Sequence, residues 1–314
     1  MADKPIHPVI KLSEEDAARI LSSWLDRDVA VSAVRRLTGG CVNTVVRVDY
    51  DDGEVVLKLS HQVEDAKLNH ECDVLRHFEQ VPAFRVPRVL HRDISGGVVP
   101  HSFFIMEYLA GVNLGDAAAV LDVGNRILIE REIGEAVVRL HEVKRERFGS
   151  CVNGTEFERW SDCFLERFHK TIREISDGQL LDADVLRQID RIQQPFSHLL
   201  NTNALPTLTH GDIWSTNIIL SPAGGMWALA GFVDPGGLYA HPEFELAYLD
   251  IWSTVGKTFH EVYRHYHTVE HGYEVRRLFY WLHTLLIHVR AFKTDYYRSA
   301  AVSLINQMIQ MIPT

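Results

Sequence analysis

Residues 209–217 read Thr-His-Gly-Asp-Ile-Trp-Ser-Thr-Asn and belong to an irregular segment, punctuated by glycine and proline, that covers residues 208–242. Within it, Asp212 comes five residues before Asn217, and Asp234 follows seventeen residues after that, behind a short apolar run. Long helical patterns flank the segment on both sides, and an elaborate loop between helices is usually functional. Two carboxylates and one amide are therefore expected to converge at this loop.

Two acidic groups and an amide at this spacing are what phosphoryl transfer requires. One carboxylate accepts the proton of the acceptor hydroxyl, and oxygen ligands hold Mg²⁺ against the phosphates. Asp212 is the expected base, and Asn217 and Asp234 are the expected metal ligands. Each residue taken alone could be an ordinary turn or capping residue, because Asp and Asn favour turns. The complete set, with an Asp-Pro after a strand, favours the catalytic interpretation.

The first third of the chain has the pattern of a small, sheet-rich lobe. An acidic turn after Ser13 predicts a capped helix, and the turn at Asp51, Asp52 and Gly53 predicts a hairpin. The predicted strands cover residues 31–37, 42–50, 54–60, 86–91 and 102–108, and a second helix covers residues 64–78.

The rest of the chain changes to long helical patterns. Within them, Trp160, Phe164 and Phe168 form an aromatic stripe at helical spacing, which is typical of a core. Short strands are expected at 218–220 and 227–233, inside the irregular segment. A mainly helical second lobe is therefore expected. Its predicted helices cover residues 126–143, 158–176, 184–200, 243–255, 271–291 and 296–311.

Lys58 is a lone cation in the apolar strand pattern of residues 55–59. Burying an unpaired ammonium is costly, so Lys58 needs an anion. Glu71, thirteen residues later in the next predicted helix, is the expected partner. Held in this way, Lys58 would reach the α- and β-phosphates of a nucleotide. The alternative is a strand at the edge of the sheet, where the lysine stem lies along the surface and the ammonium reaches water.

Two further stretches are expected to contact the nucleotide. Gly39 and Gly40 lie at the turn between the first two strands, where glycines let backbone N–H groups approach phosphate closely. The alternative there is an ordinary Gly-Gly hairpin turn without a ligand. Residues 104–109 are expected to cross from one lobe to the other, so that Glu107 and Leu109 offer backbone groups to an adenine.

Charge and composition argue against several classes of partner. The formal net charge is −10 and no run of Lys or Arg could follow a phosphate backbone, which argues against nucleic acid or an anionic membrane surface. The four cysteines are scattered without a metal-type spacing, and no early apolar segment resembles a signal peptide, so a cytoplasmic setting is expected. The apolar stretch at residues 278–292 is too short to span a bilayer and is expected to be a buried helix.

These motifs together resemble the fructosamine (ketosamine) kinase family, within the larger aminoglycoside-phosphotransferase and protein-kinase-like group. The similarity spans nearly the whole chain, and its narrower part is the run Tyr-Ala-His-Pro-Glu-Phe-Glu-Leu-Ala at residues 239–247. The other matching residues are Gly39-Gly40-Cys41, Leu57-Lys58, Glu71, Phe148-Gly149, Trp160, the stretch 210–217, Asp234-Pro235, residues 277–280 and residues 296–298.

The resemblance implies a two-lobed, protein-kinase-like α+β fold. Residues 1–109 would form the nucleotide-binding lobe, and residues 110–314 the helical lobe that carries the catalytic loop and the acceptor site. It further implies a kinase that depends on ATP and Mg²⁺. The implied acceptor is a hydroxyl of a small, sugar-like, amine-bearing molecule, with a fructosamine as the main expectation. By the same resemblance, Trp214, His241 and Glu243 would lie near that substrate.

Departures from the family pattern concern the acceptor and leave the phosphate chemistry untouched. Gly149 and Trp160 are only eleven residues apart, where the family has a longer insertion, and the family's Tyr-Gly-His and Asp-Pro-Ala are Tyr-Ala-His at 239–241 and Asp-Pro-Gly at 234–236. An aminoglycoside or another amino-containing antibiotic is therefore the competing acceptor. A nucleotide-binding pseudokinase is the competing class of protein, although the complete set of expected catalytic residues argues against it.

Overall fold

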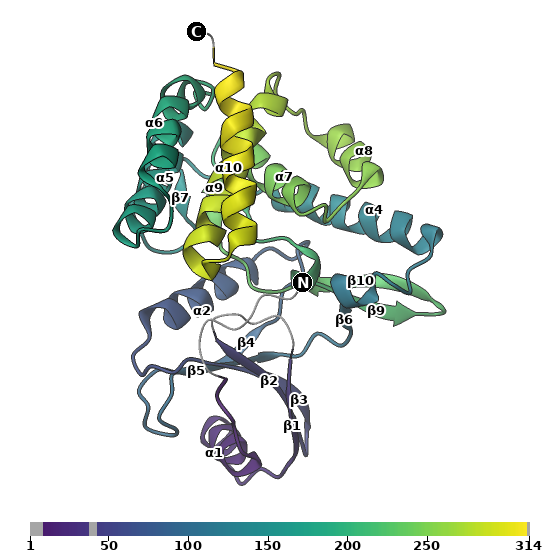
Figure 1. Cartoon of the computed structure of the whole chain (residues 1–314). Coiled ribbons are helices and arrows are strands. Elements are labelled where there is room, and N and C mark those ends of the chain that lie inside the picture. Colours follow the sequence, from purple (N-terminus) through teal and green to yellow (C-terminus); the bar gives the residue numbers. More distant parts are fainter. Residues whose placement is uncertain (1–8, 38–42, 313–314) are drawn as a thin grey trace. The chain divides into compact units, whose positions relative to one another are not determined.

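The computed structural model describes residues 9–37 and 43–312 (Figure 1). The chain forms two compact units and passes between them more than once. The first unit combines Met1–Glu132 with Ser215–Gly236, and the second combines Ile133–Trp214 with Gly237–Thr314. The first unit thus includes residues 215–236, which contain the end of the stretch 209–217, called the catalytic loop below. The two lobes predicted from the sequence, in contrast, are consecutive in the chain.

The first unit is built around a five-stranded antiparallel sheet with the strand order β1-β2-β3-β5-β4. Strand β3 lies at its centre, hydrogen-bonded to β2 on one side and β5 on the other, and residues 55–59 of β3 are all buried. The predicted hairpin is confirmed, because Tyr50 pairs with Gly53 across the turn. The strands are β1 (Val31–Arg36), β2 (Thr44–Tyr50), β3 (Gly53–Leu59), β4 (Val89–Asp93) and β5 (Phe103–Glu107).

Two helices accompany this sheet, and each begins at a capping side chain. Helix α1 (Glu14–Leu25) starts at Ser13, whose hydroxyl accepts a hydrogen bond from the N–H of Asp16 at 3.0 Å. Helix α2 (Ala66–Phe78) starts at Asp65, whose carboxylate accepts from two backbone N–H groups of the first turn. The buried face of α1 joins strand residues in one apolar core, so the sheet and the helix stabilise each other.

A second, three-stranded sheet in the first unit contains part of the irregular segment. Its strand order is β10-β9-β6, and Ile218 pairs with Phe232 at the base of the β9–β10 hairpin. The two strands predicted in the irregular segment are therefore confirmed. The elements are β6 (Val112–Asn113), the short helix α3 (Leu114–Ala117), the 3₁₀ turn η1 (Ser215–Asn217), β9 (Ile218–Ala223) and β10 (Met226–Phe232).

The second unit is mainly helical, as predicted. Trp160, Phe164 and Phe168 lie along α5 and are buried against aromatic rings of α7 and α9, which confirms this stripe as core. Helices α9 and α10 run side by side in Figure 1. The helices are α5 (Trp160–Asp177), α6 (Ala183–His198), α7 (Pro242–Ile251), α8 (Lys257–Tyr266), α9 (Tyr273–Phe292) and α10 (Asp295–Gln310), and α4 (Val123–Leu140) begins in the first unit and ends in the second.

A small sheet in the second unit fixes the segments that precede His210 and His241. Its strands are β7 (Gly149–Ser150), β8 (Thr207–Thr209) and β11 (Leu238–Ala240), in the order β7-β11-β8. Strands β8 and β11 are antiparallel, so the end of β8 that leads to His210 lies opposite the start of β11. This short sheet was not predicted, because its strands have only two or three residues each.

The helix pattern after His241 differs from the prediction. The expected helix over residues 243–255 ends at Ile251, and Ser253 takes a left-handed φ of +49°, which an α-helix does not continue through. A further helix, α8, then begins after Gly256 and was not predicted. The apolar stretch at 278–292 lies inside α9 and packs on neighbouring helices, as expected. Across residues 9–37 and 43–312, no helix has both the length and the apolar character that crossing a bilayer demands.

Buried His283 makes the stability of the fold depend on pH. It lies in α9 among aromatic rings, and burial, with the positive charge of Arg167, lowers its pKa to about 3. The unfolded chain would bind a proton at this residue below about pH 6.5. As the pH falls from about 6.5 to about 3, the unfolded state is therefore favoured by one additional bound proton.

We expect His283→Leu to remove this contribution. The free energy of unfolding of the variant, relative to the parent, should rise by up to about 1.4 kcal/mol for each pH unit below about 6. Urea unfolding at several pH values checks this. Thr284→Val is the matched control, because Thr284 is buried in the same helix and does not titrate, so its effect should be the same at every pH. Parallel pH curves for the parent and His283→Leu would contradict the prediction.

Candidate active site

The catalytic-loop stretch leaves β8 and turns sharply in the second unit. Gly211 has a left-handed φ of +79°, a conformation that glycine adopts readily. The carbonyl of His210 accepts a hydrogen bond from the N–H of Gly237 at 3.2 Å, and the Thr209 hydroxyl donates to the carbonyl of Leu238 at 2.8 Å. The N–H of Asp212 donates to Nδ1 of His210 at 3.2 Å. The loop is thus tied to β11 immediately before Asp212.

Glu245, on α7, binds the backbone of this loop. Its carboxylate accepts hydrogen bonds from the backbone N–H of His210 and from that of Gly211, the latter at 3.0 Å. The residue is fully buried, and burial raises the pKa of Glu245 to about 7 although the two backbone donors oppose the shift. A buried carboxyl group needs such donors or a cation, so Glu245 and the loop backbone stabilise each other.

Tyr248, three residues later on α7, contacts the proposed base directly. Its hydroxyl donates a hydrogen bond to Oδ1 of Asp212. Burial raises the pKa of Tyr248 well above its ordinary value, and the charge of Asp212 adds to this shift, so the hydroxyl stays protonated and remains a donor. Asp212 itself is only partly buried. Tyr248 therefore fixes the orientation of a carboxylate that substrate can still approach.

The first unit surrounds Lys58 with two carboxylates. Its Nζ lies 2.9 Å from Oε2 of Glu71 and 2.9 Å from Oδ1 of Asp234. The residue is 6% exposed and sits in the central strand β3, which excludes the alternative of a sheet edge. Burial alone would lower the pKa of Lys58, but Asp234 and Glu71 more than offset this, so its pKa is raised and the ammonium stays charged. The predicted pairing of Lys58 with Glu71 is confirmed.

The two expected metal ligands flank the β9–β10 hairpin, at its start and after its end. The N–H of Val233 donates to the carbonyl of Asn217 at 2.9 Å, so Asn217 lies beside the segment that continues into Asp234. Asp234 has a left-handed φ of +56°, and its carboxylate accepts a hydrogen bond from the ammonium of Lys58. The donor set is one carboxylate, one amide oxygen and a nearby cation for phosphate, which fits Mg²⁺ with a nucleotide because this metal takes few protein ligands besides phosphate oxygens and water.

The remaining expected nucleotide contacts have mixed outcomes. Gly39 and Gly40 lie outside the described residues. The N–H of Glu107 donates to the carbonyl of Arg88 at 2.9 Å, and its carboxylate pairs with Arg85. The expected contact of the Glu107 backbone with adenine stays a prediction. Leu109 follows β5 and is buried, and its contact with the nucleotide stays a prediction.

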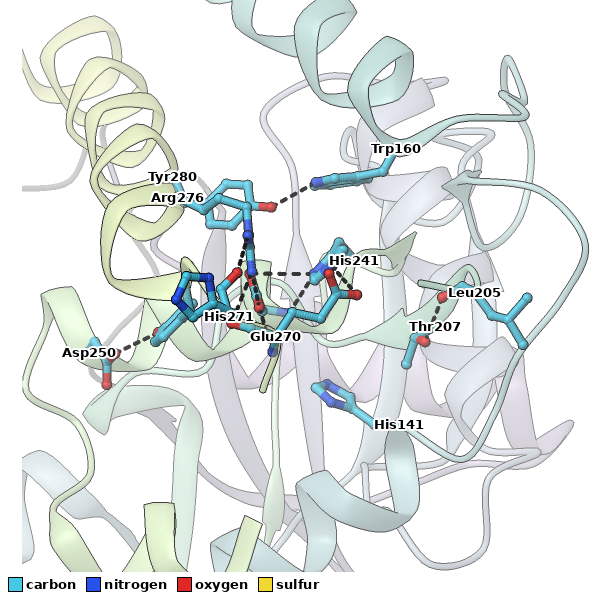
Figure 2. A network of polar contacts seen from close by, with 12 residues as sticks. His141, Trp160, Leu205, Thr207, His241, Asp250, Glu270, His271, Arg276 and Tyr280 are labelled. Atoms are coloured by element: carbon cyan, nitrogen blue, oxygen red, sulfur yellow. Dashed lines mark hydrogen bonds and ion pairs between the residues drawn. The ribbon is translucent and has the colours of Figure 1, made fainter. Parts of the chain in front are cut away.

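The three expected substrate residues are not equally placed for that role. Trp214 is only partly buried and follows the loop directly. His241 is buried at the N-cap of α7, where its Nδ1 accepts from the N–H of Glu243 at 3.1 Å. The carboxylate of Glu243 is occupied by Arg276, with two contacts of 2.7 Å, and by the N–H of Glu270 at 3.2 Å. Figure 2 shows this network. Glu243 thus anchors the α8–α9 loop, which argues against a contact with substrate.

Within the ranges 9–37 and 43–312, no three His, Cys, Asp and Glu side chains are grouped so that they could hold a metal ion. Asn217 with Asp234 is a different kind of pair, because it needs phosphate oxygens to complete the coordination. Sequence reasoning missed Glu245 and Tyr248. The available signal was a carboxylate in the apolar helix pattern Phe-Glu-Leu-Ala at 244–247, which must find a partner when buried.

The chain was compared with protein families and with known relatives. The profile of the fructosamine kinase family matches residues 13–311. The chain belongs to this family. It is 24% identical to a Staphylococcus aureus protein assigned as a ketoamine kinase, over 87% of this chain and 92% of that protein. It is 25% identical to the chloroplastic protein-ribulosamine 3-kinase of Arabidopsis thaliana (90% and 84% covered) and 22% identical to ketosamine-3-kinase of Mus musculus (88% and 96% covered).

Solved structures establish the fold. A protein from Haemophilus somnus described as a fructosamine-3-kinase superposes with a TM-score of 0.76 at 19% identity, over 94% of this chain and 97% of that chain. The aminoglycoside phosphotransferase APH(4)-Ia superposes with a TM-score of 0.67 at 16% identity, over 96% of this chain and 100% of that chain. The predicted kinase-like α+β fold, with a sheet-rich N-terminal part and a helical C-terminal part, is confirmed.

The buried cation gives a direct test of the nucleotide site. We expect Lys58→Met to weaken ATP binding about tenfold or more, because Met fills the same space without a charge for the phosphates. Isothermal titration calorimetry with ATP and Mg²⁺ measures this. Lys67→Met is the control, since Lys67 is an exposed lysine of α2. Equal affinities of the parent and Lys58→Met would show that Lys58 does not contact the nucleotide.

The hydrogen bond from Tyr248 to Asp212 predicts a change in the pH profile. Tyr248→Phe keeps the ring but removes the donor that favours the charged carboxylate, so the acidic limb of kcat/KM should move to higher pH. We expect kcat to fall about tenfold while ATP affinity is unchanged. Steady-state kinetics over a pH series checks both. A uniform loss of activity at all pH values would instead indicate that Tyr248 serves only the folding of α7.

Proposed function

We propose that this chain is an ATP-dependent kinase that transfers the γ-phosphate to a hydroxyl of a sugar-derived amine of the fructosamine class. The observation that carries the kinase part is buried Lys58, which pairs with Glu71 of α2 and with Asp234, and the chain beside Asp234 is hydrogen-bonded to Asn217. The acceptor class is supported by the family and by relatives described as ketosamine and ribulosamine kinases. ATP use is also supported by fold neighbours solved with ADP or AMP-PNP.

The proposed chemistry assigns a task to each polar group. Lys58 neutralises the charge of the α- and β-phosphates and is itself held by Glu71. Asn217 and Asp234 would hold Mg²⁺, which when bound supplies positive charge against the phosphates. Asp212, oriented by Tyr248, takes the proton of the acceptor hydroxyl. The hydroxyl oxygen attacks the γ-phosphorus of ATP, and ADP leaves. Positioning and electrostatic stabilisation would supply most of the rate, as in other phosphoryl transfers.

The departures at residues 234–236 and 239–241 concern the acceptor, and the backbone accommodates both. Gly236 follows Asp234 and Pro235 where the family pattern has alanine, and Ala240 replaces a glycine in β11 without adopting a positive φ. Ala240 is fully buried and paired with Thr207, so its methyl group is packed inside the second unit. These changes leave Lys58, Asn217 and Asp234 in place.

The deciding experiment is Mg²⁺-dependent ATP consumption against a panel of ketosamines, ribulosamines, free sugars and aminoglycosides, with the phosphate located by NMR. We expect turnover with a ketosamine or ribulosamine. Asp212→Asn is the matched control, because it keeps the shape of the side chain but cannot take the proton. It should bind ATP like the parent and lose roughly a thousandfold or more in kcat.

The other outcomes are equally informative. Turnover with aminoglycosides alone would assign the chain to antibiotic phosphorylation and leave the roles of Lys58 and Asp212 unchanged. Nucleotide binding without transfer to any acceptor would contradict the kinase proposal and favour a pseudokinase. Near-parental turnover of Asp212→Asn would remove Asp212 from the mechanism while the kinase activity stood.

A further inference from the structure

The second unit contains a cavity of about 160 Å³ that the proposed kinase mechanism does not use. Its floor is formed by buried residues, among them His141, His241 and Thr207, and exposed Leu205 and Lys144 lie at its rim. Figure 2 shows the two histidine rings together with Glu270, Thr207 and Leu205. The mixture of a buried polar floor and an exposed rim is that of a site that opens to solvent.

Both histidines present a ring nitrogen that has no hydrogen-bond partner in the part of the chain that the structure describes. These atoms are Nε2 of His141 and Nε2 of His241, and each residue is only 1% exposed. The nearest carboxylate oxygen to Nε2 of His241 is on Glu270 at 3.6 Å, too far for a hydrogen bond. Buried polar atoms are nearly always satisfied, so two in one cavity indicate a missing partner.

The contacts of the Nδ1 atoms determine whether each Nε2 atom can donate or accept a hydrogen bond in the cavity. Nδ1 of His241 accepts from the N–H of Glu243, so in the neutral ring Nε2 carries the hydrogen and is a donor. Nδ1 of His141 lies 2.7 Å from the hydroxyl oxygen of Tyr263, which can donate or accept. Burial lowers the pKa of each histidine to about 3, with help from His267 at His141 and from Arg276 at His241, so both rings are neutral near pH 7.

Charges around the cavity cancel. Glu243 is neutralised by its buried pair with Arg276, and Lys144 and Glu270 carry opposite charges. An anion in the cavity would be repelled by the carboxylate of Glu270, and a cation would be repelled by the N–H group of His241. A hydroxyl group suits both histidines, because it accepts from His241 and can accept from or donate to His141 in either tautomer.

The cavity wall is fixed by the same ion pair. Arg276 donates to the carbonyls of His271 at 2.9 Å and Glu270 at 3.2 Å, and Glu243 accepts from the N–H of Glu270. The α8–α9 loop is therefore held in place before any ligand arrives, which reduces the entropy cost of binding. The volume sets the size of the ligand, since an apolar cavity of about 150 Å³ takes a molecule of about six heavy atoms.

We infer that this cavity is a second small-molecule site, for an uncharged polyhydroxylated ligand of about six to eight heavy atoms, held by His141 and His241. His241, one of the residues expected near the substrate, lines this cavity, but neither Asp212 nor Tyr248 does, so the cavity does not reach the proposed base. Along α7, His241 and Tyr248 are separated by about 10 Å at 1.5 Å per residue, so a ligand of this size cannot contact both ends.

Calorimetry with erythritol, in the absence of nucleotide and acceptor, tests this site independently of the kinase proposal. We expect one molecule to bind with a Kd on the order of millimolar, as befits a ligand of eight heavy atoms. Succinate, an anion of the same heavy-atom count, and 1,4-diaminobutane, a cation, should bind at least tenfold more weakly. Tighter binding of either charged molecule would overturn the ligand class.

Two variants locate the site. His141→Phe removes the Nε2 atom and fills the floor, and should weaken erythritol binding tenfold or more. Leu205→Trp narrows the rim at a residue that is 60% exposed, so it leaves the core intact and should weaken binding as well. Unchanged affinity in both variants would place the binding elsewhere. Absence of binding to the parent at tens of millimolar would mean that the cavity holds only water, and either result would overturn the inference.

Discussion

A lysine ammonium in the central strand of a sheet cannot remain unpaired, and the first unit is organised around this constraint. Lys58 draws one carboxylate from α2 and another from the chain after β10, 176 residues later. The sheet, the helix and the segment after the hairpin are thereby joined at one charge, and the carbonyl of Asn217 accepts from the N–H of Val233, the residue before Asp234. A buried ion pair is weak evidence for stability, since apolar residues often replace one without loss. Its presence in an apolar strand therefore points to a cation kept for a ligand.

The second unit buries a carboxyl group, Glu245, in place of a cation. Glu245 lies inside α7 and is stabilised by two backbone N–H groups of the catalytic loop instead of by a cation. Asp212 receives a neutral donor, because the hydroxyl of Tyr248 donates a hydrogen bond to its carboxylate. Loop and helix are interdependent, because each satisfies polar groups that the other could not bury alone.

The sequence was sufficient for those features that depend on composition and local pattern. Lys58 stood out because it interrupts an apolar strand, and Glu71 was identifiable because it is near in sequence and lies in a helix. The pairing of Lys58 with Asp234 depends on how the hairpin folds onto the sheet, which no local rule encodes. Glu245 was missed for a related reason, since its partners are the backbone N–H groups of His210 and Gly211 in the turn after β8. The pairing of Glu243 with Arg276 could not be read from the sequence, because the two residues lie 33 positions apart.

Helix α7 links the catalytic loop to the cavity in the second unit. Its N-terminal turn carries His241 and Glu243, which form part of the cavity, and the next turns carry Glu245 and Tyr248, which hold the loop and Asp212. A helix moves as a rigid element, so a displacement of its N-terminus on ligand binding would reach Glu245 less than two turns away. Strand β8 makes a second connection, with Thr207 at the cavity and His210 immediately after its other end. The cavity and the catalytic loop therefore share two elements of the second unit, α7 and β8.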